Sequence, residues 1–463
     1  MAESIKCISP VDGRVYASRP VATRKQIAAV FAAAHAAQAR WQRLPLAERA
    51  AYCSAAVDAM LAMTDQIVPE LAWQMGRPVR YGAGELRGFE ERARYMIGIA
   101  EAALANLDPG PKEGFLRYVK REPLGVVFTI APWNYPYLTA VNSIVPALMA
   151  GNTVVLKHAA ATLLVAERFQ QAFDRARLPH GVFQHLVINH QQTADIIAGR
   201  HASMVCFTGS VPGGRAMEQA SAGRFINVGL ELGGKDPAYV RPDANLAHAI
   251  ENLVDGAFFN SGQSCCGIER IYVHRQVWSD FVAGAVDLTR QYLLGSPLDP
   301  ATTLGPMVKP EAAAFVRRQV KAAVRAGARA HIDAAAFPRD KVGTPYLAPQ
   351  VLTRVHHRMS VMMEESFGPV VGIMKVSDDN EAIRLMNDSP YGLTAAIWTE
   401  DVDAAQQIGD QIATGTVFMN RCDYLDPALT WTGVKESGRG ATLSRVGYET
   451  LTRPKSYHLR TKT

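Results

Sequence analysis

The stretch GVVFTIAPWNYPYLTAVNSIVPALMAGNTVVLK, residues 125–157, decides the fold class of this 463-residue chain. It contains two short apolar runs, 125–130 and 153–156, on either side of a polar loop and a longer apolar run, 137–149. Short runs that are apolar throughout are typical of strands buried on both faces, which occur in parallel sheets. The stretch therefore predicts a strand, a helix and a second, parallel strand.

This stretch is also long enough to span a bilayer, because residues 129–156 contain no charged side chain. Its prolines, asparagines and Gly151 would leave polar or broken backbone in lipid. We therefore expect a buried segment of a globular fold and no membrane partner. Residues 1–14 are polar and lack the apolar core of a signal peptide, so we expect a cytoplasmic protein.

Toward the carboxyl terminus, strands and helices continue to alternate. Up to residue 230 the predicted strands are 182–188, 204–208 and 225–230, and the predicted helices are 163–176, a short one around Ala194, and 213–222. After Gly233-Gly234 the alternation restarts with helices 245–259, 277–293, 312–326, 379–386 and 401–408 and strands 270–273, 370–375, 394–399 and 416–420. Alternation at this spacing predicts doubly wound, parallel α/β sheets, which bind ligands at the carboxyl ends of their strands.

Toward the amino terminus, residues 23–75 are alanine-rich with helical periodicity and predict at least three helices, and 85–107 predicts another. The sequence SPVDG at residues 9–13 predicts a turn between two short strands. Residues 115–121 alternate apolar and polar side chains, as a half-exposed strand does, and the basic tail 453–463 is extended. We expect these last two segments to pair and to form an arm onto a neighbouring subunit.

Composition argues against several classes of function. The net charge of +6 is small for this length and no run of Lys and Arg resembles a nucleic-acid-binding arm, so we expect no nucleic-acid partner. The six cysteines include no CxxC and no Cys/His spacing that suits a metal. We therefore expect no disulfide framework, no metal site and a reducing compartment.

Polar residues stand just beyond the predicted strands. Asn134 follows strand 125–130, Lys157 follows 153–156, the turn Gly209-Ser210 opens a helix after 204–208, and Glu231 follows 225–230. A turn of small residues at a helix N-terminus can bind an anion, and a carboxylate in apolar surroundings has a raised pKa, which suits a general base. Singly, each has a structural alternative: a turn asparagine, a solvated lysine, a plain turn and a helix-capping glutamate.

Residues 258–270, FFNSGQSCCGIER, place two adjacent cysteines, Cys265 and Cys266, after a turn of small polar residues. Such a turn can be exposed and shaped around a ligand, whereas a buried structural cysteine usually lies among apolar neighbours. Cys265 is therefore a candidate nucleophile, and the alternative is that both cysteines are small hydrophobic residues at a helix end. Two further turns could contribute to the site or could be structural only. They are ESFGPV, residues 365–370, and GVKESGRG, residues 433–440.

In this order, the motifs resemble those of the NAD(P)-dependent aldehyde dehydrogenase superfamily from about Pro123 to Gly440. The most specific pair is LELGGK, residues 230–235, followed about thirty residues later by GQSC, residues 262–265. The resemblance implies a Rossmann-like nucleotide-binding domain, an α/β catalytic domain and a small β oligomerisation arm. On this chain the NAD(P)-binding domain is 1–105 with 124–233, the catalytic domain is 234–436, and the oligomerisation or bridging segments are 106–123 and 437–463. A homodimer or homotetramer is also implied.

The resemblance further implies an oxidoreductase that converts an aldehyde to a carboxylic acid with NAD or NADP. It gives Cys265 the role of nucleophile, which forms a thiohemiacetal and then a thioester. It gives Asn134 the role of oxyanion donor, together with the backbone N–H of Cys265, and Glu231 the role of base for the hydrolytic water. The implied cofactor contacts are Trp133, Lys157, Gly209, Ser210, Glu365 and Phe367.

Some positions depart from the family pattern. Many NAD-preferring members have a glutamate three residues after the lysine, where this chain has Ala160, so NADP is admissible with Lys157 and His158 as the nearby basic residues and the preference stays open. Semialdehyde-oxidising members often have arginine eight residues after the asparagine, where this chain has Asn142, which weakens the case for a semialdehyde. Arg421 is a candidate for attracting an anionic tail, and Trp431, Tyr424 and Leu425 are candidates for the outer pocket.

Two alternative activities stay open. One is an acylating dehydrogenase that passes the thioester to coenzyme A, and Glu231 argues against it because such members commonly lack this glutamate. The other is a thiol esterase without redox chemistry.

Overall fold

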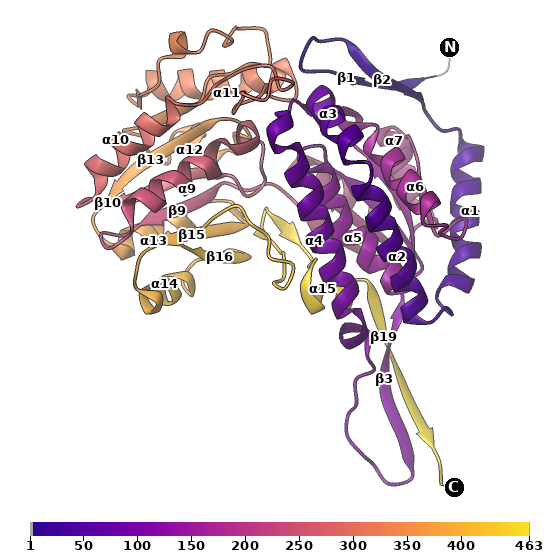
Figure 1. Cartoon of the computed structure of the whole chain (residues 1–463). Helices are drawn as coiled ribbons and strands as arrows, with labels where there is room; N and C mark the ends of the chain where they lie inside the picture. Colours follow the sequence, from indigo (N-terminus) through magenta and orange to yellow (C-terminus); the bar gives the residue numbers. More distant parts are fainter. Residues whose placement is uncertain (1–2, 463) are drawn as a thin grey trace.

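The computed structural model describes residues 3–462 and confirms the predicted α/β class. Two large sheets, each covered by helices, lie side by side, and a two-stranded ribbon projects from the body (Figure 1). The strands of the first sheet come from residues 126–231 and from a short segment at 438–439. Those of the second sheet come from residues 236–419.

Six strands form the first sheet, in the order β18, β8, β7, β4, β5 and β6. They are β4 (Val126–Ala131), β5 (Thr153–His158), β6 (Phe183–His185), β7 (Met204–Thr208), β8 (Asn227–Glu231) and β18 (Gly438–Arg439). Neighbouring strands are parallel except β18, which is antiparallel to β8. The carboxyl ends of β4, β5, β7 and β8 therefore lie along one edge, where doubly wound sheets bind ligands.

The stretch around residue 125 folds into β4, α5 (Pro136–Met149) and β5, as predicted. Every residue of β4 is buried, and β4 pairs in parallel with β5. α5 begins at Pro136, whose fixed φ suits the first turn of a helix. Within residues 3–462, no helix is both long and apolar enough to cross a membrane.

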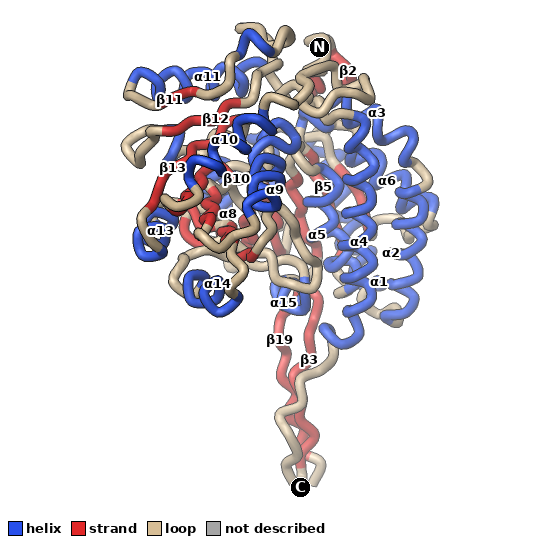
Figure 2. Tube along the Cα trace, turned by 60° about the vertical axis from the view of Figure 1, so that its left-hand side comes forward, coloured by secondary structure: helices blue, strands red, loops and turns tan. Residues whose placement is uncertain are grey.

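Helices cover both faces of the first sheet (Figures 1 and 2). Successive residues of a strand point to opposite faces, so Val127 packs with one helical layer and Phe128 with the other. The first layer contains α2 (Leu46–Leu61), α3 (Thr64–Met75), α4 (Val79–Leu104), α5 and α6 (Val165–Arg175). The second contains α1 (Arg24–Trp41), α7 (His190–Ala198) and α8 (Val211–Ser221), and a hairpin of β1 (Ser4–Ile8) and β2 (Val15–Pro20) precedes α1.

Helix α4 begins six residues before the predicted start at residue 85. Its first turns contain Gly82, Gly84 and Gly88, and glycine lowers intrinsic helix propensity, which hid the start. Packing favours glycine at two of these positions. A Cβ on Gly82 would lie 2.7 Å from Val68 Cγ1, and one on Gly88 would lie 2.5 Å from Leu138 Cδ2.

Seven strands form the second sheet, in the order β11, β12, β13, β10, β9, β15 and β16, all parallel except β11. They are β9 (Asp236–Val240), β10 (Ile268–His274), β11 (Arg329–Ala330), β12 (Gln350–Thr353), β13 (Val370–Val376), β15 (Thr394–Trp398) and β16 (Thr416–Met419). Its helices are α9 (Leu246–Phe258), α10 (Trp278–Thr289), α11 (Pro310–Arg325), α12 (Ser360–Met363), α13 (Asp379–Asn387) and α14 (Val402–Gly409).

The sequence did not predict β9, although this strand lies in the middle of the second sheet, between β10 and β15. It follows Gly233-Gly234 directly and begins with Asp236-Pro237, and aspartate and proline are both depleted in strands. The buried carboxylate of Asp236 accepts hydrogen bonds from Thr394 N (3.1 Å) and Thr394 Oγ1 (2.6 Å). This satisfies the polar group, which allows the residue to open a central strand.

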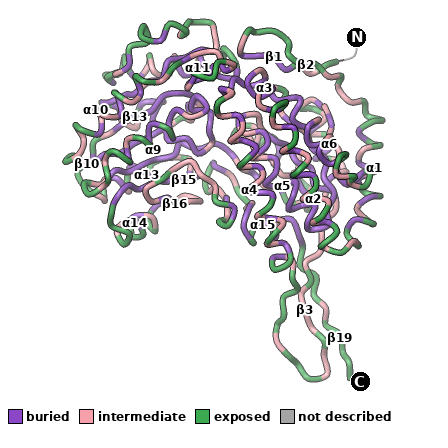
Figure 3. Tube along the Cα trace, viewed as in Figure 1, coloured by how far each residue is buried: buried purple, intermediate pink, exposed green. Residues whose placement is uncertain are grey.

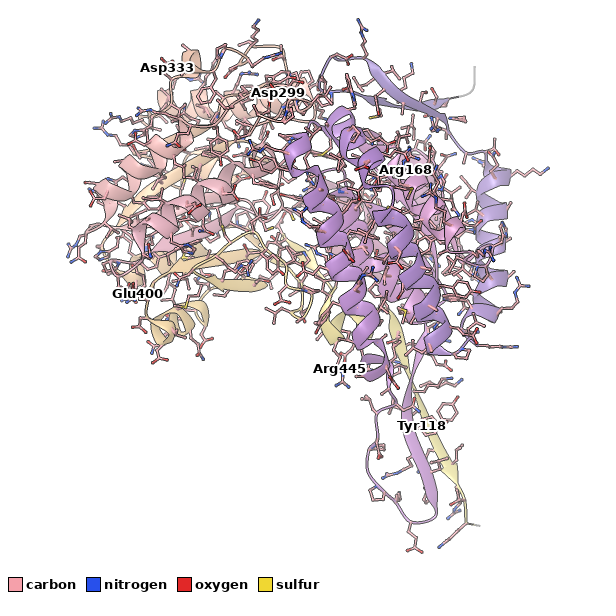
Figure 4. The ribbon with its side chains drawn as sticks, in the orientation of Figure 1. Tyr118, Arg168, Asp299, Asp333, Glu400 and Arg445 are labelled. Carbon is pink, nitrogen blue, oxygen red and sulfur yellow. The ribbon has the colours of Figure 1, made fainter. Side chains whose placement is uncertain are left out.

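The projecting ribbon is formed by β3 (Phe115–Pro123) and β19 (Thr452–Arg460), which pair antiparallel over their whole length. The predicted pairing of these segments is thus confirmed within one chain. Tyr118, labelled on the projecting part in Figure 4, stacks on Tyr457 with ring centroids 4.5 Å apart. Figure 3 shows that nearly all residues of the ribbon are exposed or of intermediate burial, and most residues of β19 are exposed. α15 (Ser444–Thr450) precedes β19 and is fixed to α4 by Tyr448 Oη, which donates to Met96 O at 2.6 Å.

Candidate active site

Cys265 lies between α9 and β10, directly after the short helix η2 (Phe259–Gly262). Asn260, Ser261 and Gly262 have φ values of 53°, 58° and 69°, a conformation that residues other than glycine rarely adopt. The amide of Asn260 donates to Gln263 O (3.2 Å) and to Asn134 O (3.1 Å), which holds the turn. The turn leaves Cys265 half-buried at the wall of a cavity.

The glycine pair of LELGGK explains why this motif occurs together with GQSC. A Cβ on Gly234 would lie 2.7 Å from Cys265 O, and one on Gly233 would lie 2.2 Å from Glu365 Oε1. Only glycine allows the cysteine loop and the Glu365 turn to approach this backbone so closely. Gly234 N also donates to Glu365 Oε1 at 3.1 Å, and burial raises the pKa of Glu365 to about 8.

Asn134 lies in the loop between β4 and α5 and is 5 % exposed. Its Nδ2 donates to Gln263 O at 3.2 Å, so the side chain bonds the cysteine loop and not its own turn. An amide nitrogen carries two N–H groups, and this bond is its only one within residues 3–462, so one donor stays free. The structure therefore brings Asn134 and the Cys265 loop together.

Glu231 ends β8 and is fixed by two hydroxyl groups. Its Oε2 accepts from Thr208 Oγ1 at 2.7 Å, and its Oε1 accepts from Thr442 Oγ1. Burial raises the pKa of Glu231, while the two threonine hydrogen bonds and the charge of Arg92 oppose the shift. The carboxylate is therefore more basic than an exposed glutamate and is held in one orientation.

Cys265 and Glu231 line the same cavity, which has a volume of about 360 Å³. Its wall includes residues of α4 and α5 from the first sheet's side and residues of the second sheet's loops, including Tyr424, Leu425 and Trp431 as predicted for the outer pocket. A second cavity of about 280 Å³ lies over β4, β7 and β8 and shares Glu231 with the first. The glutamate thus stands between two spaces that are large enough for water or substrate.

The predicted cofactor residues lie in two places. Trp133, Glu365 and Phe367 lie in loops between the two sheets, and Lys157, Gly209 and Ser210 lie at the carboxyl ends of β5 and β7. Trp133 and Phe367 meet edge to face with ring centroids 5.6 Å apart, so the loop after β4 and the Glu365 turn contact each other through aromatic side chains. Lys157 is the second-to-last residue of β5, and no acceptor within residues 3–462 bonds its ammonium group. Burial lowers the pKa of Lys157.

Gly209 and Ser210 lie at the N-terminus of α8. Gly209 N donates to Glu231 O at 3.0 Å, and Ser210 Oγ accepts from Gly213 N at 3.3 Å as the N-cap of the helix. His158, considered as a basic residue near the cofactor, is buried, and its ring contacts Ala159 N, Thr162 Oγ1 and Pro136 O. Burial lowers the pKa of His158 to about 4, so the ring is neutral at pH 7 and Lys157 is the remaining cation at this strand end.

Sequence reasoning did not find the residues that hold the site in place. Thr208 and Thr442 fix Glu231, but a lone threonine has no sequence signal for such a role. Lys235 and Glu269 form a buried ion pair, and Glu269 accepts from Ser366 N (2.8 Å) and Phe367 N (2.9 Å), which orients the Glu365 turn. Within residues 3–462, no group of three or more His, Cys, Asp or Glu side chains is arranged to hold a metal ion.

Arg77 connects the two loops of the site from behind. Its guanidinium is 2 % exposed, forms an ion pair with Glu85, donates to Asn134 O (2.6 Å), and approaches Asn260 Oδ1 (3.4 Å). Glu85 in turn accepts from Tyr137 N at 2.9 Å. Removal of Arg77 leaves a buried carboxylate without its cation.

We expect Arg77→Met to lower the free energy of unfolding by about 3–5 kcal/mol, because it breaks a buried ion pair from one side. Urea unfolding followed by fluorescence measures this loss. Arg80→Met, an exposed arginine three residues later in the first turn of α4, is the control and should cost under about 1 kcal/mol. Equal unfolding curves for the two variants would contradict this view of Arg77.

The chain matches the aldehyde dehydrogenase family over residues 1–457. It is 32% identical, over 96% of this chain and 97% of the relative, to a succinate-semialdehyde dehydrogenase [NADP(+)] 1 of Mycobacterium bovis. The structure is similar to that of an NAD-dependent aldehyde dehydrogenase from Sinorhizobium meliloti, with a TM-score of 0.95 and 30% identity over 100% of this chain and 92% of that one. It is also similar to succinic semialdehyde dehydrogenase from Streptococcus pyogenes in complex with NADP+, with a TM-score of 0.93 and 27% identity over 98% of this chain and 100% of that one.

The family match covers nearly the whole chain, and the structural matches include both large sheets and the ribbon. The chain therefore belongs to the aldehyde dehydrogenase family and is an NAD(P)-dependent enzyme that oxidises an aldehyde to a carboxylic acid.

Proposed function

We propose that Cys265, Asn134 and Glu231 carry out this oxidation, with Cys265 as the nucleophile and the acid product released by hydrolysis. The observation that supports it best is the shared cavity: the thiol of Cys265 and the carboxylate of Glu231 line one space, and Asn134 is hydrogen-bonded to the loop of that cysteine. A nucleophile, an oxyanion donor and a base are the groups that this chemistry requires.

In the first step, the thiolate of Cys265 attacks the aldehyde carbon and the carbonyl oxygen becomes an oxyanion. The free N–H of Asn134 Nδ2 and the backbone N–H of Cys265 stabilise this charge. The tetrahedral carbon can then release hydride, which a planar aldehyde carbon cannot, and the carbon is left as a thioester on Cys265.

NAD(P)+, when bound, supplies the hydride acceptor. The residues proposed to hold it are Trp133, Lys157, Gly209, Ser210, Glu365 and Phe367. They fit such a ligand because the ammonium group of Lys157 has no acceptor within residues 3–462. A phosphate group would satisfy the lysine, and the aromatic pair would border the planar ring.

In the last step, a water molecule attacks the thioester carbon, and its proton passes to Glu231. The bond to sulfur then breaks and the thiolate of Cys265 is restored, together with the carboxylic acid. The raised pKa of Glu231 suits it to accept this proton, and the bonds from Thr208 and Thr442 hold it in one orientation in the wall of the cavity that it shares with Cys265.

Aldehyde oxidation with and without coenzyme A tests this proposal. We expect NAD(P)H formation without coenzyme A and stoichiometric release of the free acid. An absolute requirement for coenzyme A would support the acylating alternative, and ester hydrolysis without any NAD(P)H formation would support the thiol esterase.

Lys157 is expected to influence the cofactor preference. Ala160 provides no carboxylate to repel a 2′-phosphate, and His158 is neutral, so Lys157 is the cation available at this strand end. We expect Lys157→Met to raise the KM for NADP+ at least about 10-fold more than the KM for NAD+, the effect of one charged hydrogen bond. Steady-state kinetics with both cofactors measure this, and Lys25→Met, an exposed lysine of α1, is the control. An equal change in both KM values would contradict it.

We propose that residues 1–105 with 124–233 form the cofactor-binding unit and that residues 234–436 form the catalytic unit. We also propose that the ribbon joins copies of the chain into a dimer or tetramer. A lone two-stranded ribbon is marginal in water, and this one exposes the apolar pair Leu116 and Leu459, which are 52% and 46% exposed. Sedimentation equilibrium should give at least twice the chain mass of 50.4 kDa. A monomer at micromolar concentration would contradict this assembly.

A further inference from the structure

We propose that Arg92 binds a carboxylate at the far end of the aldehyde, so that the enzyme's substrates are semialdehydes. This inference rests on the proposed function, because it places the aldehyde group of the same molecule at Cys265. Arg92 lies on α4 and lines the cavity that Cys265 and Glu231 share.

The guanidinium of Arg92 is buried without an ionic partner. The residue is 8 % exposed, and no carboxylate oxygen of residues 3–462 lies within 4.0 Å of its nitrogens. Its Nη1 donates to Leu138 O (2.8 Å) and Asn142 Oδ1 (3.3 Å), whereas Nε and Nη2 have no acceptor within the described chain. A buried charge is costly unless it is paired, so this one is suited to an external anion.

The charges of Glu85 and Glu231 act on Arg92 from a distance, but within the described chain no carboxylate forms an ion pair with it, and each carboxylate around the cavity has other polar partners. Glu85 is paired with Arg77, Glu231 with Thr208 and Thr442, and Asp423 with Ser264 and Cys266, while Glu91 accepts from the hydroxyl of Tyr424. Within residues 3–462, the guanidinium of Arg92 therefore has no ion-pair partner, in a cavity that it shares with the Cys265 thiol and the Glu231 carboxylate.

Asn142 has a clear part in this arrangement. The absence of arginine at residue 142 had weakened the case for a semialdehyde, but the Oδ1 of Asn142 accepts from Arg92 and so orients a guanidinium that arrives from another helix. Arg421, the alternative candidate, is not among the residues that line the cavity, and its guanidinium lies over the Tyr424 ring at 3.9 Å. Arg87 of α4 also lines the cavity, but it is exposed, so the buried cation of this site is Arg92.

The same face of α4 leaves room for a ligand. Gly88 and Gly84 line the cavity one and two turns before Arg92, and a Cβ on Gly84 would meet nothing closer than 3.7 Å. The volume of about 360 Å³ is within the range of small-molecule sites. A carboxylate can accept two N–H bonds from the free edge of a guanidinium, which discriminates strongly against an uncharged end.

Two aldehydes of equal length test the inference: succinate semialdehyde and butanal, compared by kcat/KM. A charged hydrogen bond corresponds to roughly 10–150-fold, so we expect the wild type to prefer the semialdehyde at least about 30-fold. Arg92→Met should bring this ratio close to one, Arg92→Lys should give an intermediate ratio, and Arg94→Met, an exposed arginine two residues away, should leave it unchanged.

Each outcome decides between distinct explanations. If Arg92→Met lowers kcat/KM for both aldehydes equally, Arg92 acts on Cys265 or Glu231 and the inference is wrong. If the wild type oxidises butanal as well as the semialdehyde, the inference is wrong while the proposed function stands, and if the wild type oxidises neither, the proposed function itself fails. Should Arg92→Met not fold, competitive inhibition of the wild type by succinate but not by butyrate supports the anion site, and equal inhibition overturns it.

Discussion

Cys265→Ser should lower the rate of NAD(P)H formation at least about 10³-fold while the variant still binds the cofactor. A serine hydroxyl is a poor nucleophile without an adjacent base, and Glu231 is held by Thr208 and Thr442 and not by residue 265. Cofactor binding should persist because the predicted contacts lie on other loops. Steady-state kinetics measure the rate, and quenching of protein fluorescence by NAD(P)H measures the binding.

Cys266→Ser is the matched control for this experiment. The Cys266 side chain is 3 % exposed and donates to Asp423 Oδ1 at 2.9 Å, a bond that a serine hydroxyl can also form. The hydrogen bond with Cys265, burial and the charge of Asp423 raise the pKa of the Cys266 thiol well above its ordinary value, so it is an un-ionised thiol at neutral pH. Full activity in Cys265→Ser, or complete loss of activity in Cys266→Ser alone, would show that Cys265 is not the nucleophile.

Glu231→Gln should lower kcat by about 10²–10⁴-fold while one rapid turnover of NAD(P)H formation persists. Hydride release precedes hydrolysis, so only the step that needs a base is lost. Glutamine keeps the shape of glutamate and can bond both threonine hydroxyls, so the fold should remain. Stopped-flow absorbance at 340 nm should show a burst of about one NAD(P)H per site, and the absence of a burst would place Glu231 in an earlier step.

We expect kcat to depend on pH in the direction given by a general base with a raised pKa. Burial raises the pKa of Glu231, and the group accepts a proton only when ionised, so kcat should fall as the pH falls through that raised value. The same acidic limb should be missing in Glu231→Gln.

The fold could be predicted from sequence for segments whose residues are nearly all buried or follow one regular pattern of burial. β4 and the centre of β5 are almost entirely apolar because helices cover both faces of the first sheet, and their sequence alone shows this. β9 was missed because Asp236 is tolerated only through its bonds to Thr394, a residue far away in the sequence. The start of α4 was missed because its glycines are favoured by packing against Val68 and Leu138.

Some residues of the candidate site could likewise be predicted from sequence and others could not. Cys265, Asn134 and Glu231 follow strands or helices with a recognisable pattern of small residues, and they could be proposed from sequence. The residues that hold them could not, because Arg77 and Thr442 are defined by contacts between distant segments. The role of Arg92 could not be predicted either. It follows from the lack of a carboxylate partner within residues 3–462, which only the folded structure shows.

The most direct test of the account is the identification of the acylated residue. Glu231→Gln, mixed with aldehyde and NAD(P)+ and quenched in acid, should carry the acyl group, because the thioester forms but is hydrolysed slowly. Peptide mass spectrometry should place the added mass on Cys265 and leave Cys266 unmodified. Acylation of Cys266, or an unmodified protein after a full burst of NAD(P)H, would contradict the central claim that Cys265 carries the thioester that Glu231 resolves.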